Sequence, residues 1–541
     1  MFPLYGDPRG VGLVVDICEP EPREKSGHFL IPKTKPTHID QDTIEYLRRK
    51  GVFNFPAPAV CEMMIRTYLH YVHPFFPVVD AHSFLDIFEN RCNEFADDST
   101  LKEADFSSRK EMKRAMYIRA KVALYDAEYE RSKITLIQAV LLTGFWYSDT
   151  EDRTGPWHWN GIAISLCQTI GLHRHPDAGR KRSKAIPTSD SIIWRELWWC
   201  CFYREAWFSA GMGRPMRINI ADCSTRMPHA NDSDNLLAGI PEHIRKKYLP
   251  EGTKELSKLW TELLTLTVSL AKILSWQNRA DQTRPSRTEI QQIDDTIRQH
   301  CFDKDHGMGH AHSHVVSLHM YHLELYRDSV LLTLYRPFLF DKPEMNSPDL
   351  PADEWTLTVL RRGKDAATNT NRVLGNMIGD DMISNCQAMV CIALVPTLQI
   401  HLLDATSEKQ MVQRMGRHNL EFCMMVIEEL KSVYFGAELL SRMFTKARDW
   451  ILYRKSVPAT APREYTPQSS RDFAVGSLPV LPDDACQDDA GIFDAFATML
   501  SPFASVSAGG LFNNDELLDF ESAATLEQLM FPEPESSADT H

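Results

Sequence analysis

Apolar residues recur three and four positions apart along most of the chain from Asp40 to Tyr453, the spacing that one face of an α-helix produces. Alternation of the kind that strands show between turn signals is scarce. The clearest helical stretch runs from Ala59 to His73 and stops before Pro74, and Asp80 is placed to cap the helix after it. The same spacing predicts helices at 81–92, 110–130, 134–146, 161–170, 191–210, 254–277, 315–335, 355–377, 385–403, 410–434 and 437–451. We therefore predict an all-α fold.

Composition divides the chain into four parts. Residues 1–39 are rich in Pro and Gly without a period, so we expect an irregular segment before the helical body at 40–455. Ser, Pro and Thr dominate 456–482, which is typical of a linker, and 483–541 form an acidic tail that we expect to be disordered. The apolar run from Met389 to Leu403 is short and contains Pro396, which favours a buried helix over a membrane span.

Charge is distributed unevenly along the 541 residues. Residues 458–541 hold 15 Asp and Glu against 2 Lys and Arg, which accounts for −13 of the net charge of −14. The first 60 residues carry 8 acidic and 8 basic side chains, without the basic stripe that direct DNA binding requires. Twelve scattered cysteines and no secretory signal indicate reduced thiols in a cytosolic or nuclear setting.

The segment from Trp157 to Arg174 contains a short apolar helix with a marked end. Gly171 lies where a left-handed cap is needed, and Leu172 can fold back onto Cys167. Trp157 and Trp159 flank the start of the helix. This segment favours a well-packed helix end, and a ligand-sensing pocket is the alternative.

A second segment has an acid on an apolar helix face. Glu205 shares its face with Trp198, and a buried carboxylate is costly unless it is paired. Arg214 and Arg217 are the nearest partners in the sequence. We expect a structural ion pair here, with an effector-sensing acid as the alternative.

In order and spacing these segments resemble the middle homology region of fungal zinc-cluster transcription factors, and in particular that of the cutinase gene regulators. The likeness extends from about Asp40 to Tyr453, with supporting matches at Tyr71–Pro77 and Leu334–Phe338. The residues that carry the signature are Trp157, Trp159, Gly161, Gly171, His173, Arg174, Trp198, Trp199, Glu205, Gly213, Arg214 and Pro215.

The resemblance implies a nuclear transcriptional regulator, expected to activate a specific fungal metabolic or secondary-metabolite gene set. Six closely spaced cysteines are needed for a binuclear zinc cluster, but Cys18 is the only cysteine in the first 60 residues. We therefore expect no bound metal or other cofactor, and contact with promoter DNA through a partner. The expected partners are transcription coactivators, zinc-cluster regulators in homo- or hetero-oligomers, and a small-molecule effector, with no membrane. The alternative is a negative regulator that sequesters a zinc-cluster partner.

Other candidate sites are weaker. The four histidines of His306–His314 could bind a metal but read more simply as a solvated loop. An all-helical Mg²⁺-dependent lyase is a remote alternative, because Asp294-Asp-Thr-Ile-Arg298 ends in Arg where a third acid belongs. No catalytic residues are expected, and the chain is not expected to be an enzyme. A basic run forms a candidate nuclear import signal, with plain solvated surface as the alternative: Arg180, Lys181, Arg182 and Lys184.

The acidic tail contains three apolar clusters among its carboxylates. Such sequences bury too little surface to fold alone but can form short amphipathic helices in the groove of a coactivator. Docking of the tail on its own helical body is the alternative. The side chains expected to make these contacts are Ile492, Phe493, Phe496, Leu500, Phe503, Leu511, Phe512, Leu517, Leu518, Phe520, Leu526, Leu529 and Phe531.

Overall fold

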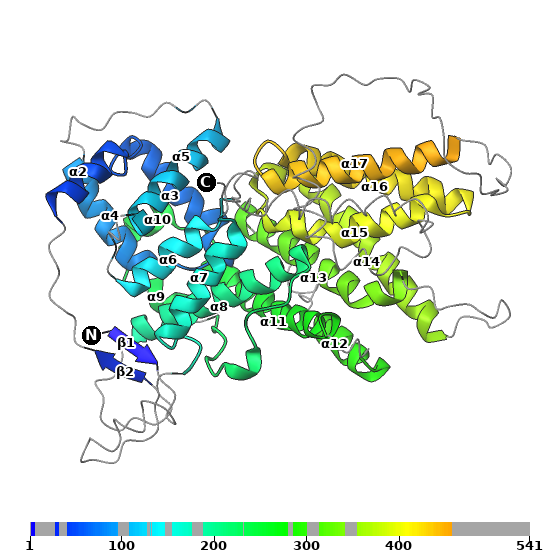
Figure 1. Ribbon diagram of the computed structural model, residues 1–541, viewed down its shortest axis with the longest axis horizontal. Helices are drawn as coiled ribbons and strands as arrows, with labels where there is room; N and C mark the ends of the chain where they lie inside the picture. Colours follow the sequence, from blue (N-terminus) through cyan, green and yellow to red (C-terminus); the bar gives the residue numbers. More distant parts are fainter. Residues whose placement is uncertain are drawn as a thin grey trace, which may run out of the picture.

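Helices make up nearly all of the structure, which confirms the all-α prediction (Figure 1). The structure is a computed structural model that describes residues 2–5, 28–31, 40–95, 106, 108–126, 130, 132–146, 154–175, 188–230, 232–237, 239–279, 285–299, 313–340 and 354–456. Its α-helices are α2 (Gln41–Arg49), α3 (Pro58–Tyr71), α4 (Ala81–Phe95), α5 (Arg109–Lys121), α6 (Lys133–Thr143), α7 (Pro156–Thr169), α8 (Thr188–Met212), α9 (Asp232–Leu237), α10 (Glu242–Tyr248), α11 (Thr253–Gln277), α12 (Arg287–Gln299), α13 (His314–Phe340), α14 (Glu354–Gly379), α15 (Met389–Thr406), α16 (Gln410–Leu430) and α17 (Phe435–Ser456). Shorter turns are η1 (His73–Phe75), η2 (Val122–Asp126), η3 (Ile220–Asp222) and η5 (Ile383–Asn385).

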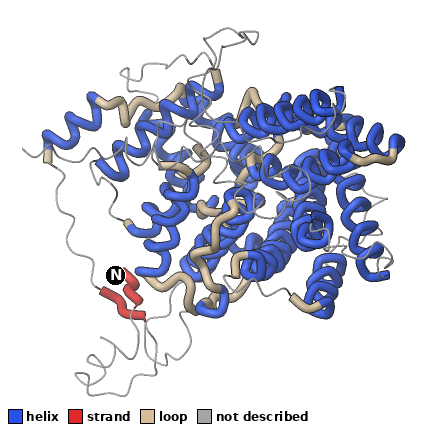
Figure 2. The backbone as a smooth tube through the Cα atoms, turned by 45° about the vertical axis from the view of Figure 1, so that its right-hand side comes forward, coloured by secondary structure: helices blue, strands red, loops and turns tan. Residues whose placement is uncertain are grey.

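The helices that are apolar on all sides lie at the centre of the molecule. Helix α13 packs against α11, α14 and α15, while α8 packs against α7, α11 and α15. The N-terminal helices lie together at one end, and α14–α17 form the other end (Figure 1). Figure 2 shows the described strands beside the N-terminus, at the edge of the helices. Helices with one apolar face, such as α12, α14 and α16, cover this centre with that face turned inward. The sequence pattern thus sets which helices are central and which are peripheral.

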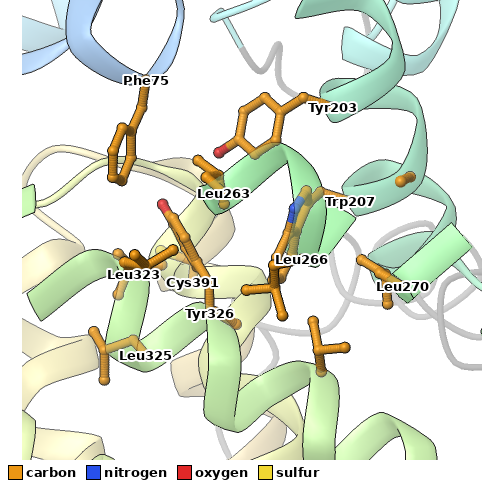
Figure 3. Close-up of a cluster of buried hydrophobic side chains, with 14 of the residues drawn as sticks. Phe75, Tyr203, Trp207, Leu263, Leu266, Leu270, Leu323, Leu325, Tyr326 and Cys391 are labelled. Atoms are coloured by element: carbon orange, nitrogen blue, oxygen red, sulfur yellow. The ribbon is translucent and has the colours of Figure 1, made fainter. Parts of the chain in front are cut away.

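Aromatic side chains fill the contact between α8, α11 and α13 (Figure 3). The Trp207 ring lies 4.9 Å from the Tyr326 ring, and the Trp207 indole N–H donates to the Thr267 hydroxyl at 3.4 Å. Both rings are almost fully buried, at 1% and 0% exposed. Buried tyrosine and tryptophan need a hydrogen-bond partner, and Tyr326 finds one in Gln387 at 3.3 Å. This region is therefore packed core.

A smaller apolar cluster joins α3, α4, α9 and α10. Tyr248 is fully buried in it and donates its hydroxyl proton to Glu89 on α4. Lys247 on α10 bridges Glu62 and Glu89, at 2.9 and 3.2 Å. The predicted cap before α4 is confirmed, because the Asp80 carboxylate accepts from the His82 N–H at 3.1 Å.

Helix α15 is long and apolar enough to cross a membrane by length and composition alone, although 56% of it is buried in the protein. It packs against α8, α13, α14 and α16, so its apolar surface is covered by other helices. Its position agrees with the buried helix predicted around Pro396. The predicted start at 385 is wrong, because Ile383–Asn385 form a 3₁₀ turn and the α-helix begins at Met389.

The N-terminal segment differs from the prediction of an irregular chain. Strands β1 (Phe2–Tyr5) and β2 (His28–Ile31) pair antiparallel, with Phe2 opposite Ile31 and Leu4 opposite Phe29. Four-residue strands 22 residues apart are too short to give a recognisable alternation in the sequence. Ser456, the first residue of the linker predicted at 456–482, ends α17; the rest of that linker and the acidic tail at 483–541 lie outside the described residues.

Candidate functional site

The signature segment begins inside a helix rather than before it. Pro156 occupies the first turn of α7, where its missing N–H costs nothing, so Trp157 and Trp159 belong to the helix itself. Trp159 is 2% exposed, and its indole N–H donates to the Tyr117 hydroxyl at 3.2 Å. The interpretation of the two tryptophans as flanks of the helix start is therefore wrong.

The predicted cap at Gly171 is confirmed. Gly171 has a φ of +78°, the left-handed conformation that glycine adopts readily. The Leu172 N–H donates to the Cys167 carbonyl at 2.9 Å, and the Gly171 N–H donates to Gln168 at 3.1 Å. These two bonds define a Schellman motif. The next residue, His173, is buried beside Trp198, with ring centroids 5.6 Å apart.

Glu205 forms the centre of a buried polar cluster, which we call the Glu205 cluster: Glu205, Arg217, Asn160 and Trp157. The Glu205 side chain is 0% exposed and forms an ion pair with Arg217, with Arg217 Nη2 2.6 Å from Oε2. Arg217 Nε and the Arg217 backbone N–H both donate to Oε1, at 3.0 and 2.7 Å. The Asn160 amide of α7 donates to Oε2 at 3.0 Å. The expected structural ion pair is present, and its partner is Arg217.

Trp157 holds the outer side of the Arg217 guanidinium. The guanidinium carbon lies 3.8 Å from the centre of the Trp157 ring, and Arg217 Nη1 donates to the Trp157 carbonyl at 3.0 Å. Stacking of this kind fixes a planar cation while leaving its edge free for the carboxylate. Arg214, the other predicted partner, lies 5.6 Å from the same ring centre without an ion pair to Glu205.

Gly161 lies directly beneath this arginine. A Cβ atom at Gly161 would be 2.3 Å from Arg217 Nη1, closer than any side chain can approach. Glycine is therefore needed at this position so that the guanidinium can reach both Glu205 and Trp157. At the end of α8, Gly213 has a φ of +61° and the Arg214 N–H donates to the Ser209 carbonyl at 3.1 Å. This turn sends Pro215 and Arg217 back toward α7.

Arg204 is a buried charge that sequence reasoning missed. It is 4% exposed and donates to the carbonyls of Leu141 and Gly144 at the end of α6, at 2.9 and 2.7 Å. Its guanidinium lies 4.2 Å from the centre of the Phe145 ring. Burial lowers the pKa of Arg204 to about 10. No pattern in the sequence could have found this contact, because carbonyl groups at a helix end leave no residue signal.

Tryptophans 198 and 199 take different roles. Trp198 is 1% exposed in the core beside His173, whereas the Trp199 indole N–H donates to the Arg226 carbonyl at 2.8 Å. Trp199 thus ties α8 to the loop that follows it. Arg174 continues the turn after Gly171, with its N–H donating to the Gly171 carbonyl at 3.0 Å.

The acid pair considered for Mg²⁺ is a structural centre instead. Asp294 is fully buried and accepts from Arg298 Nε at 2.9 Å and from Arg362 Nη1 at 2.6 Å. The Tyr335 hydroxyl also donates to Asp294. Arg298 lies four residues after Asp294, on the same side of α12, and can therefore pair with it.

Among the described residues, no group of three or more His, Cys, Asp or Glu side chains is placed to hold a metal ion. Several predicted sites lie outside the described residues: His306, His310 and His312 of the histidine tract, the basic run Arg180, Lys181, Arg182 and Lys184, and every tail side chain predicted to contact a coactivator. These assignments remain predictions.

The Glu205 cluster consists of an acid, an amide, a cation and an aromatic ring. Every polar atom of its carboxylate is used to bind α7 and the loop after α8 to α8 itself. A charge held in this way can stabilise a fold, but it lacks a free lone pair for proton transfer. The geometry supports a structural role.

Three fungal regulatory proteins illustrate what this chain is similar to. Cutinase transcription factor 1 beta of Fusarium vanettenii is 25% identical over 74% of this chain and 51% of the relative. Cutinase transcription factor 1 alpha of the same organism is 24% identical over 77% of this chain and 46% of the relative. The acetamidase regulatory protein of Emericella nidulans is 29% identical over 31% of this chain and 22% of the relative.

The chain thus spans about half the length of the two cutinase factors that it matches. No solved structure matches it. The family model of the fungal specific transcription factor domain matches residues 94–302 of the chain. This range contains the whole Glu205 cluster. The match confirms the resemblance that the sequence motifs indicated.

Proposed function

We propose that this protein is a nuclear regulator of transcription that activates a specific fungal metabolic or secondary-metabolite gene set. The observation that carries the proposal is the match to the fungal specific transcription factor domain over residues 94–302. Its relatives are named as transcription factors and regulatory proteins, in agreement with the expectation that the chain is not an enzyme.

In this proposal the helical body serves as a scaffold. Its buried charges are used internally: Glu205 pairs with Arg217, and Asp294 pairs with Arg298 and Arg362. A scaffold of this kind presents fixed outer surfaces for other proteins and for a small-molecule effector. The basic run at 180–184 serves as the nuclear import signal.

The acidic tail recruits the transcription machinery. Its carboxylates keep bulky residues such as Phe493, Phe496 and Phe503 in solution and steer them toward basic coactivator surfaces. These 541 residues carry no cysteine pattern for a binuclear zinc cluster, so in this proposal they reach promoter DNA through a zinc-cluster partner rather than by direct contact.

A fusion experiment tests the recruiting role. Residues 458–541 are joined to a foreign DNA-binding domain, and transcription of a reporter gene is measured. We expect strong activation by the wild-type fusion. A matched fusion with Phe493, Phe496 and Phe503 replaced by alanine keeps every acid, and we expect it to lose most of the activation. A silent wild-type fusion contradicts the activator role and favours a regulator that sequesters its partner.

A binding experiment tests the indirect contact with DNA. The purified chain is titrated against promoter fragments at about 0.1 M salt, a concentration at which non-specific phosphate contacts are already weakened. We expect binding only after a zinc-cluster partner is added. Tight binding by the chain alone contradicts this part of the proposal.

A further inference from the structure

The outer face of α16 carries large apolar side chains that no described part of the chain covers. Met411, Met415 and Met425 are 71%, 51% and 60% exposed. The opposite face of the same helix is buried against α14, α15 and α17. Exposed apolar groups in a row are costly in water, and methionine is common on surfaces that bind other proteins.

These methionines line up along the helix. Met411, His418 and Met425 follow one another at intervals of seven residues, which is close to two helical turns. The patch continues sideways onto α14, where Ile378 is 46% exposed, one turn beyond Gly375. A Cβ atom at Gly375 would lie 3.9 Å from the Phe422 ring, so the two helices are in contact there. We call this surface the α16 face: Met411, Met415, His418, Phe422, Met425 and Ile378.

The charges beside the α16 face differ in sign along the helix. Arg414 is exposed in its first half and Glu421 in its second half. Within the described residues, neither forms an ion pair. Because the two lie seven residues apart, they project from one line on the helix, beside the line of Met411, His418 and Met425.

We propose that two copies of the chain pair antiparallel through the α16 face, about a two-fold axis near His418. Met411 and Met425 each lie seven residues from His418, so the axis brings Met411 opposite the partner's Met425 and the reverse. Arg414 then meets the partner's Glu421 on both sides of the axis. A two-fold interface of this kind uses the same surface on both subunits.

The charge pattern selects a second copy over the acidic tail as the occupant. Residues 458–541 hold 15 acids and 2 bases, so they would place negative charge against Glu421 as well as Arg414. An inverted copy of α16 supplies a cation opposite each anion and an anion opposite each cation.

The length of the helix sets the strength of the contact. At roughly 1.5 Å per residue, the 21 residues of α16 give a contact about 31 Å long. One helix from each copy makes an interface below the size of permanent dimers, so we expect dissociation constants in the micromolar range. This inference does not depend on the proposed function.

Sedimentation velocity of the full chain between roughly 1 and 100 µM tests the pairing. We expect a concentration-dependent dimer for the wild type. Arg414→Glu and Glu421→Arg each place like charges against each other twice, so each raises the dissociation constant about tenfold or more. The double variant R414E/E421R restores both ion pairs with reversed polarity and returns the constant to within about threefold of wild type.

Two controls keep the result interpretable. Arg361→Glu makes the same charge change at an exposed site on α14, outside the α16 face, and leaves the dimer unchanged. Far-ultraviolet circular dichroism and melting temperature establish that each variant is folded. A full chain that stays monomeric overturns the proposal. This holds even if removal of residues 457–541 produces a dimer, because the tail would then be what covers the α16 face in the full chain. Dimers that ignore both single changes, or a double variant that stays as weak as the singles, also overturn it.

Discussion

Replacement of Arg217 by alanine removes the cation from the Glu205 cluster and leaves its acid in place. Glu205 is 0% exposed, but the Arg217 side chain is 31% exposed, so water can fill only part of the place that the guanidinium leaves. Of its four hydrogen bonds, the two from the Arg217 side chain are lost. The bonds from the Arg217 backbone N–H and from Asn160 remain.

The expected cost follows from this partial loss. Removing one partner of a buried ion pair costs about 3–5 kcal/mol when the remaining charge is uncompensated. The two retained hydrogen bonds offset about 1 kcal/mol of that cost, because they still partly compensate the carboxylate. We therefore expect Arg217→Ala to lower the free energy of unfolding by about 2–4 kcal/mol.

Urea unfolding followed by circular dichroism at 222 nm measures this change. The matched control is Arg214→Ala, which removes a neighbouring arginine near the same Trp157 ring without touching a carboxylate. We expect a loss of about 0.5 kcal/mol or less for the control, as for an ordinary surface change. The double variant E205L/R217M removes both charges and is expected to recover most of the stability that R217A loses. Equal losses in Arg217→Ala and Arg214→Ala would refute the claim that Glu205 depends on this ion pair.

Three further predictions concern other buried groups. Gly161→Ala pushes the Arg217 guanidinium off its partners and is expected to cost about 1–3 kcal/mol in the wild type but little in an R217A background, as a double-mutant cycle in urea can measure. Burial lowers the pKa of His401 to about 4, so the stability that this neutral histidine allows is present above about pH 6.5 and is lost as pH falls toward 4. We expect the free energy of unfolding to fall by about 2 kcal/mol less between pH 7 and pH 5 in His401→Gln than in the wild type, as unfolding curves at the two pH values can measure. Burial also raises the pKa of Glu196 to about 8, so the folded state keeps a proton that the unfolded chain has released, and stability falls as pH rises from about 4.5 to 8. Glu196→Gln, which can still bond Trp260, is expected to be more stable than wild type at pH 8 by roughly 3 kcal/mol and equal to it near pH 5; an unchanged pH slope would count against this reasoning.

The sequence was informative where one local rule decides the structure. Gly171 and Asp80 were predicted from capping rules that involve only a few neighbouring residues, and both are confirmed. Glu205 was recognised because an acid on an apolar helix face needs a partner, and Arg217 was one of two arginines within reach. In each case the physical requirement and the residue that meets it lie close together in the chain.

The helices and contacts that are not among the predictions have equally specific causes. Helix α12 is absent from the predicted helices, although Ile290, Ile293 and Ile297 repeat there at helical spacing and indicate one. The short helices α9 and α10 give too few turns for a period to show. Arg204 could not be found, because its partners are backbone carbonyls of another helix.

One structural consequence is shared by Glu205, Asp294 and Arg204. Helices α8, α13 and α15 are apolar on nearly every side, and such surfaces can pack against one another in several rotations and registers at similar energy. Glu205 can be satisfied only when α7 and the loop after α8 are correctly placed, and Asp294 only when α12, α13 and α14 meet. Arg204 likewise requires the end of α6 against α8. Each wrong packing would leave a charge buried without partners, at a cost of several kcal/mol. We infer that these charges select one arrangement among many that the apolar residues alone would allow, which explains why a signature rich in tryptophans and glycines also contains the acid Glu205.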